Sequence, residues 1–99
     1  MMATQVFYEG RVHGVGFRGT ARHIASGYDV CGWVRNLPDG RVELQVAGEK
    51  AEVTSYLGEI RESALAGLIT AEQIHPIVID KPFKGFQILP GAPLFPSLA

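Results

Sequence analysis

Residues 10–18 hold three glycines at the junction of a predicted strand and a predicted helix, and this junction constrains the fold more than any other segment. The strand covers residues 5–11, where apolar and polar side chains alternate, and the helix covers residues 19–26. Residues 10–18 read GRVHGVGFR. Glycines let backbone N–H groups converge on one point, and the start of a helix adds partial positive charge. We therefore expect an anion site here, in which Arg18 adds a planar fork of donors suited to phosphate.

A hairpin follows the first helix. Two β-rich runs, residues 30–36 and 41–46, are joined by a strong turn signal, Leu-Pro-Asp-Gly at residues 37–40. The second run alternates, so one face is expected in the core and the other in solvent. The predicted core positions are Val42, Leu44 and Val46, and the predicted solvated positions are Arg41, Glu43 and Gln45.

A second helix and one or two more strands complete the pattern. The helix is predicted to begin near Glu49 and to present an apolar stripe of Val53, Leu57, Ile60 and Ala64. Residues 72–79 predict a strand that is irregular or at an edge, because Pro76 lacks an N–H. Residues 83–89 are consistent with a short final strand, and residues 90–99 predict a tail without regular structure.

The element order is β-α-β-β-α-β, which is typical of the α+β ferredoxin-like sandwich. That fold is an antiparallel sheet with two helices on one face. We expect one domain over residues 1–89, followed by the tail over residues 90–99.

Composition narrows the possible partners. The 99 residues carry a net charge of −1, so no overall field attracts nucleic acid or an acidic membrane. The chain lacks an apolar run long enough to span a bilayer, and its N-terminus lacks the features of a signal peptide, so we expect a cytoplasmic protein. We also expect a monomer. His23, His75 and Cys31 lack metal-ligand spacing, and Cys31 is expected to be a structural thiol.

Residues 14–19 also match the G-x-G-x-x-G pattern of dinucleotide-binding folds. In such folds an acidic residue follows at the end of a second parallel strand, whereas Asp39 lies in the hairpin turn. The chain is also too short for a doubly wound domain. We therefore predict no nucleotide cofactor.

Two separated motifs resemble the acylphosphatase family. Its usual string is G-[RK]-V-Q-G-V-G-F-R followed by G-x-V-x-N, and this chain carries GRVHGVGFR at residues 10–18 and GWVRN at residues 32–36. The resemblance extends over about residues 5–89 and includes the Asp-Gly turn at residues 39–40 and the closing GFQI at residues 85–88. It implies a ferredoxin-like fold and hydrolysis of acyl phosphates, without metal or cofactor, to a carboxylate and inorganic phosphate.

The resemblance also implies residue roles. Arg18 corresponds to the phosphate-binding arginine and Asn36 to the asparagine that orients the attacking water. The implied phosphate-binding residues are His13, Gly14, Val15, Gly16, Phe17 and Arg18. His13 departs from the family, which usually has glutamine there. Two interpretations stay open: the position contributes only its backbone N–H, or its side chain positions the loop.

Two rival functions are weighed against the enzyme. The first is a noncatalytic module that binds phosphate or acyl phosphate, which the presence of both Arg18 and Asn36 disfavours. The second is a ferredoxin-like domain that binds nucleic acid or protein through aromatic residues such as Phe7 and Trp33. The near-neutral charge disfavours this second alternative, and we expect neither a nucleic-acid nor a membrane partner.

Overall fold

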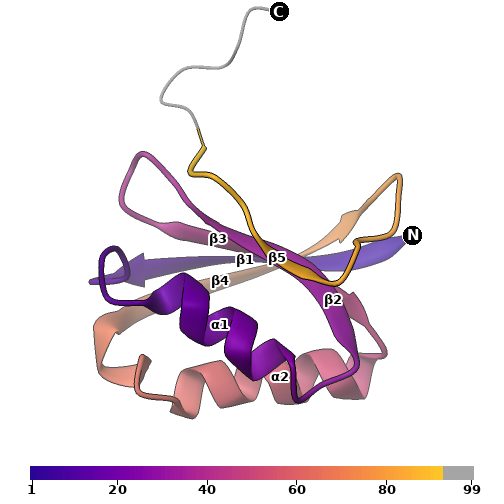
Figure 1. Cartoon of the computed structure of the whole chain (residues 1–99), viewed down its shortest axis with the longest axis horizontal. Coiled ribbons are helices and arrows are strands. Elements are labelled where there is room, and N and C mark those ends of the chain that lie inside the picture. Colours follow the sequence, from indigo (N-terminus) through magenta and orange to yellow (C-terminus); the bar gives the residue numbers. More distant parts are fainter. Residues whose placement is uncertain (93–99) are drawn as a thin grey trace, which may run out of the picture.

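The computed structural model describes residues 1–92 and places two helices against one face of a five-stranded sheet (Figure 1). The elements in chain order are β1 (Met2–Gly10), α1 (Phe17–Ala25), β2 (Val30–Asn36), β3 (Val42–Gly48), α2 (Lys50–Glu62), the 3₁₀ turn η1 (Ala66–Leu68), β4 (Ile69–Val78) and β5 (Phe86–Ile88). Within the described part of the chain, no helix is long and apolar enough to cross a membrane. The predicted order β-α-β-β-α-β is confirmed, with β5 added at its end.

The sheet has the strand order β4-β1-β3-β2-β5, so β1 and β3 are central. β1 pairs with β3 and β4, and β2 pairs with β3, all in antiparallel orientation. β5 pairs with β2 in parallel. The sheet is therefore mixed, and the expectation of a wholly antiparallel sheet is corrected by this short last strand. The sequence pattern did not reveal it, because three residues carry too little periodicity to indicate strand direction.

β1 and β2 run in the same direction because each is antiparallel to the β3 strand between them. Their C-terminal residues therefore lie at the same end of the sheet. Val42, at the start of β3, is opposite Tyr8 on one side and opposite Asn36 on the other. This row of three residues places the end of β2 close to the loop that follows β1.

The core lies between the sheet and the two helices. The predicted inward face of β3 is confirmed, because Val42, Leu44 and Val46 have no exposed surface. The helices are joined by a hydrogen bond from the Tyr56 hydroxyl to the Ala21 carbonyl oxygen, 2.9 Å long and buried. A satisfied buried hydrogen bond of this kind contributes on the order of 1 kcal/mol, and it fixes α1 against α2.

Several predicted boundaries shift. α1 begins two residues before the predicted Gly19, because Gly16 ends the loop in a left-handed conformation and the helix starts directly after it. α2 ends at Glu62, so the predicted core position Ala64 lies outside the helix and is exposed, and Leu65 is buried in its place. β1 begins at Met2, β3 continues to Gly48 and β4 begins at Ile69, because pairing between strands extends each beyond its alternating segment.

The face of the sheet opposite the helices is less solvated than the alternation predicts. Glu43 lies on this face, yet only 4% of it is exposed. Its carboxylate accepts hydrogen bonds from Arg35 at 2.9 Å, Gln5 at 2.8 Å and Gln45 at 3.2 Å. Gln5 and Arg35 belong to the neighbouring strands β1 and β2, whereas Gln45 belongs to β3 itself. The burial of Glu43 therefore depends on sheet register, which sequence periodicity does not encode.

The two edges of the sheet are β4 and β5. Pro76 lies opposite Thr4 within β4, which confirms the prediction that its strand is at an edge. The predicted tail begins after β5, and residues 90–92 have no regular secondary structure. Residues 93–99, which hold the remainder of the predicted tail, lie outside the described residues.

Candidate active site

The glycine-rich loop of residues 11–16 and the C-terminal end of β2 lie at the same end of the sheet (Figure 1). β1 leads into the loop at Gly10, and β2 ends at Asn36, two parallel strands separated only by β3. The predicted phosphate-binding residues and the predicted water-binding residue are therefore brought to the same part of the fold. They come from different elements, a loop with the first turn of α1 on one side and a strand end on the other.

Two buried side chains anchor the loop. Val12 and Phe17 are each 1% exposed, whereas residues 13–16 between them are all exposed. Phe17 packs against the ring of Tyr8, with the two ring centres 4.9 Å apart. Burial raises the pKa of Tyr8 far above its ordinary value, with a smaller contribution from the charge of Glu72, so this phenol stays neutral beside the loop.

The backbone between these anchors turns twice through the left-handed region. Gly14 has a φ of 72° and Gly16 a φ of 76°. A side chain at either position would face open space, so glycine is needed for the backbone conformation and not for lack of room. Gly14 and Gly16 therefore shape the tight turn between β1 and α1.

The first turn of α1 has backbone donors to offer. Gly16 is the N-cap residue, and within the described chain no side chain caps the helix there with a hydrogen bond to its backbone N–H groups. The first turn also holds no acidic residue. Within residues 1–92, the backbone N–H groups of residues 13–19 donate to no other backbone group, and the first such bond is from Thr20 N to Gly16 O at 2.9 Å. Unpaired N–H groups at the positive end of a helix favour a bound anion.

Arg18 adds a full positive charge to these donors. It lies in the first turn of α1 and is half-buried. Among the residues that the structure describes, no carboxylate forms an ion pair with its guanidinium; the three pairs found there join Arg35 to Glu43, Arg41 to Asp39 and Arg61 to Glu72. Its charge is therefore available to a ligand.

A small cavity lies directly against this loop. Its volume is about 180 Å³, and its lining comprises Val12, Gly14, Gly16, Phe17, Arg18, Gly19 and Ile88. A larger cavity of about 480 Å³ lies between α2 and the strands β1, β3 and β4, and its lining is mostly apolar. The smaller cavity has the donors that an anion needs, so we take it as the candidate site.

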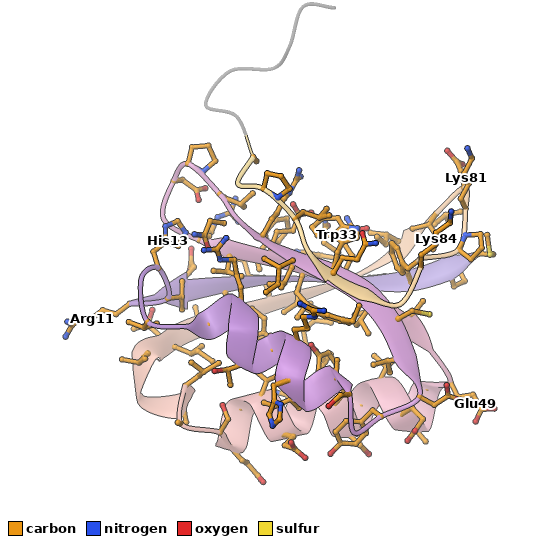
Figure 2. All side chains as sticks on the ribbon, in the orientation of Figure 1. Arg11, His13, Trp33, Glu49, Lys81 and Lys84 are labelled. Carbon is orange, nitrogen blue, oxygen red and sulfur yellow. The ribbon has the colours of Figure 1, made fainter. Side chains whose placement is uncertain are left out.

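His13 fastens the loop to the hairpin. Its Nε2 lies 2.8 Å from the backbone carbonyl oxygen of Arg41, at the start of β3, and Figure 2 shows its ring between the loop and the hairpin. A carbonyl oxygen only accepts hydrogen bonds, so Nε2 is the donor. Of the two interpretations left open by the sequence, this contact supports the one in which the side chain positions the loop.

Asn36 presents an unsatisfied acceptor. It is the last residue of β2, and its side-chain Oδ1 is buried with no hydrogen-bond partner among the described residues. A buried acceptor without a donor costs about 1–3 kcal/mol, so such groups commonly receive a hydrogen bond from water or ligand. Asn36 is not part of the lining of the 180 Å³ cavity. Ile88, which does line it, pairs with Val34, two residues before Asn36 in β2.

The other arginines have different surroundings. The sequence predicts that Arg11, Arg22, Arg35 and Arg41 are all solvated. Arg11 and Arg22 are exposed, which confirms the prediction for these two, and Figure 2 shows Arg11 pointing away from the loop. The prediction is wrong for Arg35 and Arg41, because both are half-buried and ion-paired. Each guanidinium also lies over an aromatic ring of the open face, Arg35 over Trp33 at 5.0 Å and Arg41 over Phe7 at 4.4 Å. A base could stack on these rings only by displacing an arginine.

Residues 1–92 hold no group of three or more His, Cys, Asp or Glu side chains placed to bind a metal ion. Cys31 is a half-buried free thiol in β2. Two residues that the structure brings to the site were not among the predicted site residues. Ile88 lines the cavity, and Ala92 donates its backbone N–H to the Asn36 carbonyl oxygen at 3.0 Å. Ile88 lies in the closing GFQI segment, whereas Ala92 has no sequence signal because only its backbone takes part.

Comparisons with known proteins agree with this geometry. The acylphosphatase family model matches residues 4–88. A curated acylphosphatase of Methylococcus capsulatus is 36% identical over 89 residues, covering 90% of this chain and 97% of the relative. The crystal structure of acylphosphatase from Bacillus subtilis matches with a TM-score of 0.80 at 27% identity, covering 90% of this chain and 99% of that one. Full-length HypF, solved in a phosphate- and nucleotide-bound form, matches with a TM-score of 0.81 at 29% identity, covering 91% of this chain but 12% of HypF.

Proposed function

Because the chain belongs to the acylphosphatase family, we propose that it hydrolyses the carboxyl–phosphate anhydride bond of acyl phosphates. The products are a carboxylate and inorganic phosphate. The observation that carries this proposal is the set of unpaired loop amides next to Arg18, whose charge lacks a carboxylate partner within residues 1–92. These groups are donors only, and they suit the phosphoryl end of such a substrate.

In the proposed complex, the phosphoryl group occupies the loop cavity. Backbone N–H groups of residues 13–18 donate to its oxygens, and Arg18 offsets the negative charge. Phosphoryl transfer needs mainly positioning and charge stabilisation, because little covalent chemistry is left to the protein. The exposed loop with its two left-handed glycines supports this role, since the backbone N–H groups of residues 13–18 donate to no other backbone group within residues 1–92.

Asn36 holds the attacking water in this proposal. Its buried Oδ1 accepts a hydrogen bond from the water, and the side-chain amide provides a donor. The water oxygen attacks phosphorus in line with the leaving group, and the P–O bond to the acyl group breaks with its electron pair on the carboxylate. The substrate's own phosphoryl oxygen takes the proton of the water, since an amide is too weak a base.

The leaving group explains why so few groups are required. A carboxylate is already a stable anion, so it needs no general acid to protonate it as it departs. An arginine, a set of amides and an asparagine therefore form a sufficient set of groups for this reaction. We propose that the protein requires neither metal nor cofactor.

Hydrolysis of benzoyl phosphate in the presence of EDTA tests the proposal. We expect activity in the unsubstituted protein, a loss of about 1000-fold or more in kcat/KM for Arg18→Ala, and a loss of about 100-fold or more for Asn36→Ala. Arg22→Ala is the matched control, because Arg22 lies one turn further along α1, is exposed and has the same charge. Near-normal activity of Asn36→Ala would contradict its role with the water.

The same experiment separates the enzyme from a phosphate-binding module. A folded protein that binds inorganic phosphate at the loop, yet hydrolyses no acyl phosphate from a panel with small, acidic and aromatic acyl groups, would be a binding module. An activity that EDTA abolishes and a divalent metal restores would instead overturn the metal-independent mechanism.

A further inference from the structure

The chain continues alongside β2 after β5 has ended. Leu89 donates its backbone N–H to the Val34 carbonyl oxygen, and Ala92 donates to the Asn36 carbonyl oxygen, both at 3.0 Å. Between them the backbone passes close to Asn36, since a Cβ atom added to Gly91 would lie 3.6 Å from the Asn36 carbonyl oxygen and 3.9 Å from its Cβ. We call residues 89–92 the C-terminal strap.

The strap gives Asn36 a second neighbour. On one side Asn36 is opposite Val42 of β3, and on the other its carbonyl oxygen is held by Ala92. The last residue of a strand is prone to fray when it has partners on one side only. A side chain that orients a reacting water must be held to within about 0.5 Å, and this requires a fixed backbone beneath it.

The same stretch of chain also borders the phosphate cavity. Ile88, the last residue of β5, lines that cavity and is opposite Val34 in β2. The segment from Ile88 to Ala92 therefore touches both halves of the site. We propose that the C-terminal strap is a positioning segment, in which the Ala92 N–H fixes the Asn36 backbone so that its side chain holds the attacking water; this inference rests on the proposed function.

A single substitution removes the key donor. Ala92→Pro deletes one N–H without shortening the chain, whereas Ala92→Ser keeps the N–H and is the matched control. We expect Ala92→Pro to lower kcat for benzoyl phosphate about tenfold, less than the roughly 100-fold cost of a 1 Å misplacement, with KM unchanged. Ala92→Ser is expected to match the unsubstituted protein.

Asn36 also offers a direct readout, because it is the only asparagine in the 99 residues. Protein labelled with ¹⁵N only at asparagine gives one side-chain NH₂ signal, which reports this group alone. We expect Ala92→Pro to shift or broaden that signal and Ala92→Ser to leave it in place. Unchanged kcat together with an unchanged NH₂ signal in Ala92→Pro would overturn the proposal.

The two readouts distinguish failure of this inference from failure of the proposed function. If the unsubstituted protein hydrolyses no acyl phosphate, the proposed function fails, while the NH₂ signal still decides whether the strap fixes Asn36. If Ala92→Pro lowers kcat and raises KM together, or lowers the melting temperature as much as the activity, the strap is structural and the positioning role is wrong.

Discussion

The two halves of the candidate site are built in opposite ways. The phosphate half, residues 13–18, leaves its backbone N–H groups without partners among residues 1–92 and exposes four of its residues in a row. The other half, Asn36, lies at the end of a paired strand with a hydrogen bond from Ala92 on its free side. In the proposed function, the loop binds an anion with donors that the described fold leaves unpaired, whereas the strand end orients a water because the fold holds it in place.

This contrast has an energetic side. The exposed N–H groups of the loop can be hydrated, so leaving them unpaired in the protein costs little. The buried Oδ1 of Asn36 is shielded from bulk solvent and has no partner among the described residues, and an unsatisfied acceptor of this kind costs about 1–3 kcal/mol. A water bound there recovers part of that free energy, so the strand-end half is expected to bind one tightly.

The largest expected effect is on the affinity for inorganic phosphate, which should depend on the phosphate half and not on Asn36. We expect Arg18→Ala to raise the Kd for inorganic phosphate at least about tenfold, because it removes a charge-assisted donor worth roughly 1.5–3 kcal/mol. Asn36→Ala should leave the Kd within about twofold, because the proposed role of Asn36 is to hold the water and not the phosphoryl group. Titration of the backbone amide signals of residues 13–18 by NMR measures both constants. Equal losses of binding would mean that the halves are not separate.

The next effect is on the free energy of unfolding and depends on the loop conformation. It is tested by alanine substitutions at two glycines three residues apart. Gly16→Ala places a side chain at a φ of 76° and should destabilise the protein by roughly 1–2 kcal/mol. Gly19→Ala lies inside α1, where alanine is favoured over glycine by about 1 kcal/mol, and should stabilise it slightly. Urea denaturation measures both. A neutral Gly16→Ala would show that the loop does not need the left-handed backbone.

A smaller effect is expected at His13. His13→Ala removes the contact with the Arg41 carbonyl oxygen, and a single neutral hydrogen bond of this kind contributes about 0.5–1.5 kcal/mol. We expect KM for benzoyl phosphate to rise about threefold to tenfold while kcat changes little. His13→Gln keeps a side-chain N–H donor and should recover most of the loss. Steady-state kinetics of the three proteins checks this, and no change in His13→Ala would limit the position to its backbone.

The smallest effect is a pH dependence in the hairpin turn that connects the halves. Hydrogen bonds from the backbone N–H and guanidinium of Arg41 lower the pKa of Asp39. Because the pKa is lower in the folded state, the stabilisation is present above the unfolded pKa of about 3.9 and is lost as pH falls through the folded value. Asp39→Asn should therefore lower the melting temperature slightly at neutral pH and not at about pH 2. A difference that grows on acidification would contradict this assignment.

The sequence predicted the phosphate half better than the strand-end half. The glycines, Arg18 and the start of a helix are local features, and local pattern is enough to place them in one loop. The position of Asn36 at the end of its strand was predicted, but the contact that holds it there was not. That contact uses the backbone N–H of Ala92, a group that every residue except proline has, so it leaves no pattern in the sequence. The burial of Glu43 was missed for a related reason, since its partners come from β1 and β2 and only the register brings them together.

Pro76 has a consequence beyond its own strand. The outer rim of β4 is the longer of the two open edges of the sheet, and two apolar side chains flank the proline there, Ile74 at 46% and Val78 at 73% exposed. A strand from another molecule that docked on this rim would find no donor at Pro76 and could not form a continuous hydrogen-bond ladder. At the opposite rim β5 offers only three residues. We therefore expect Pro76 to hinder edge-to-edge growth of the sheet into aggregates, although apolar side chains lie along its longer rim.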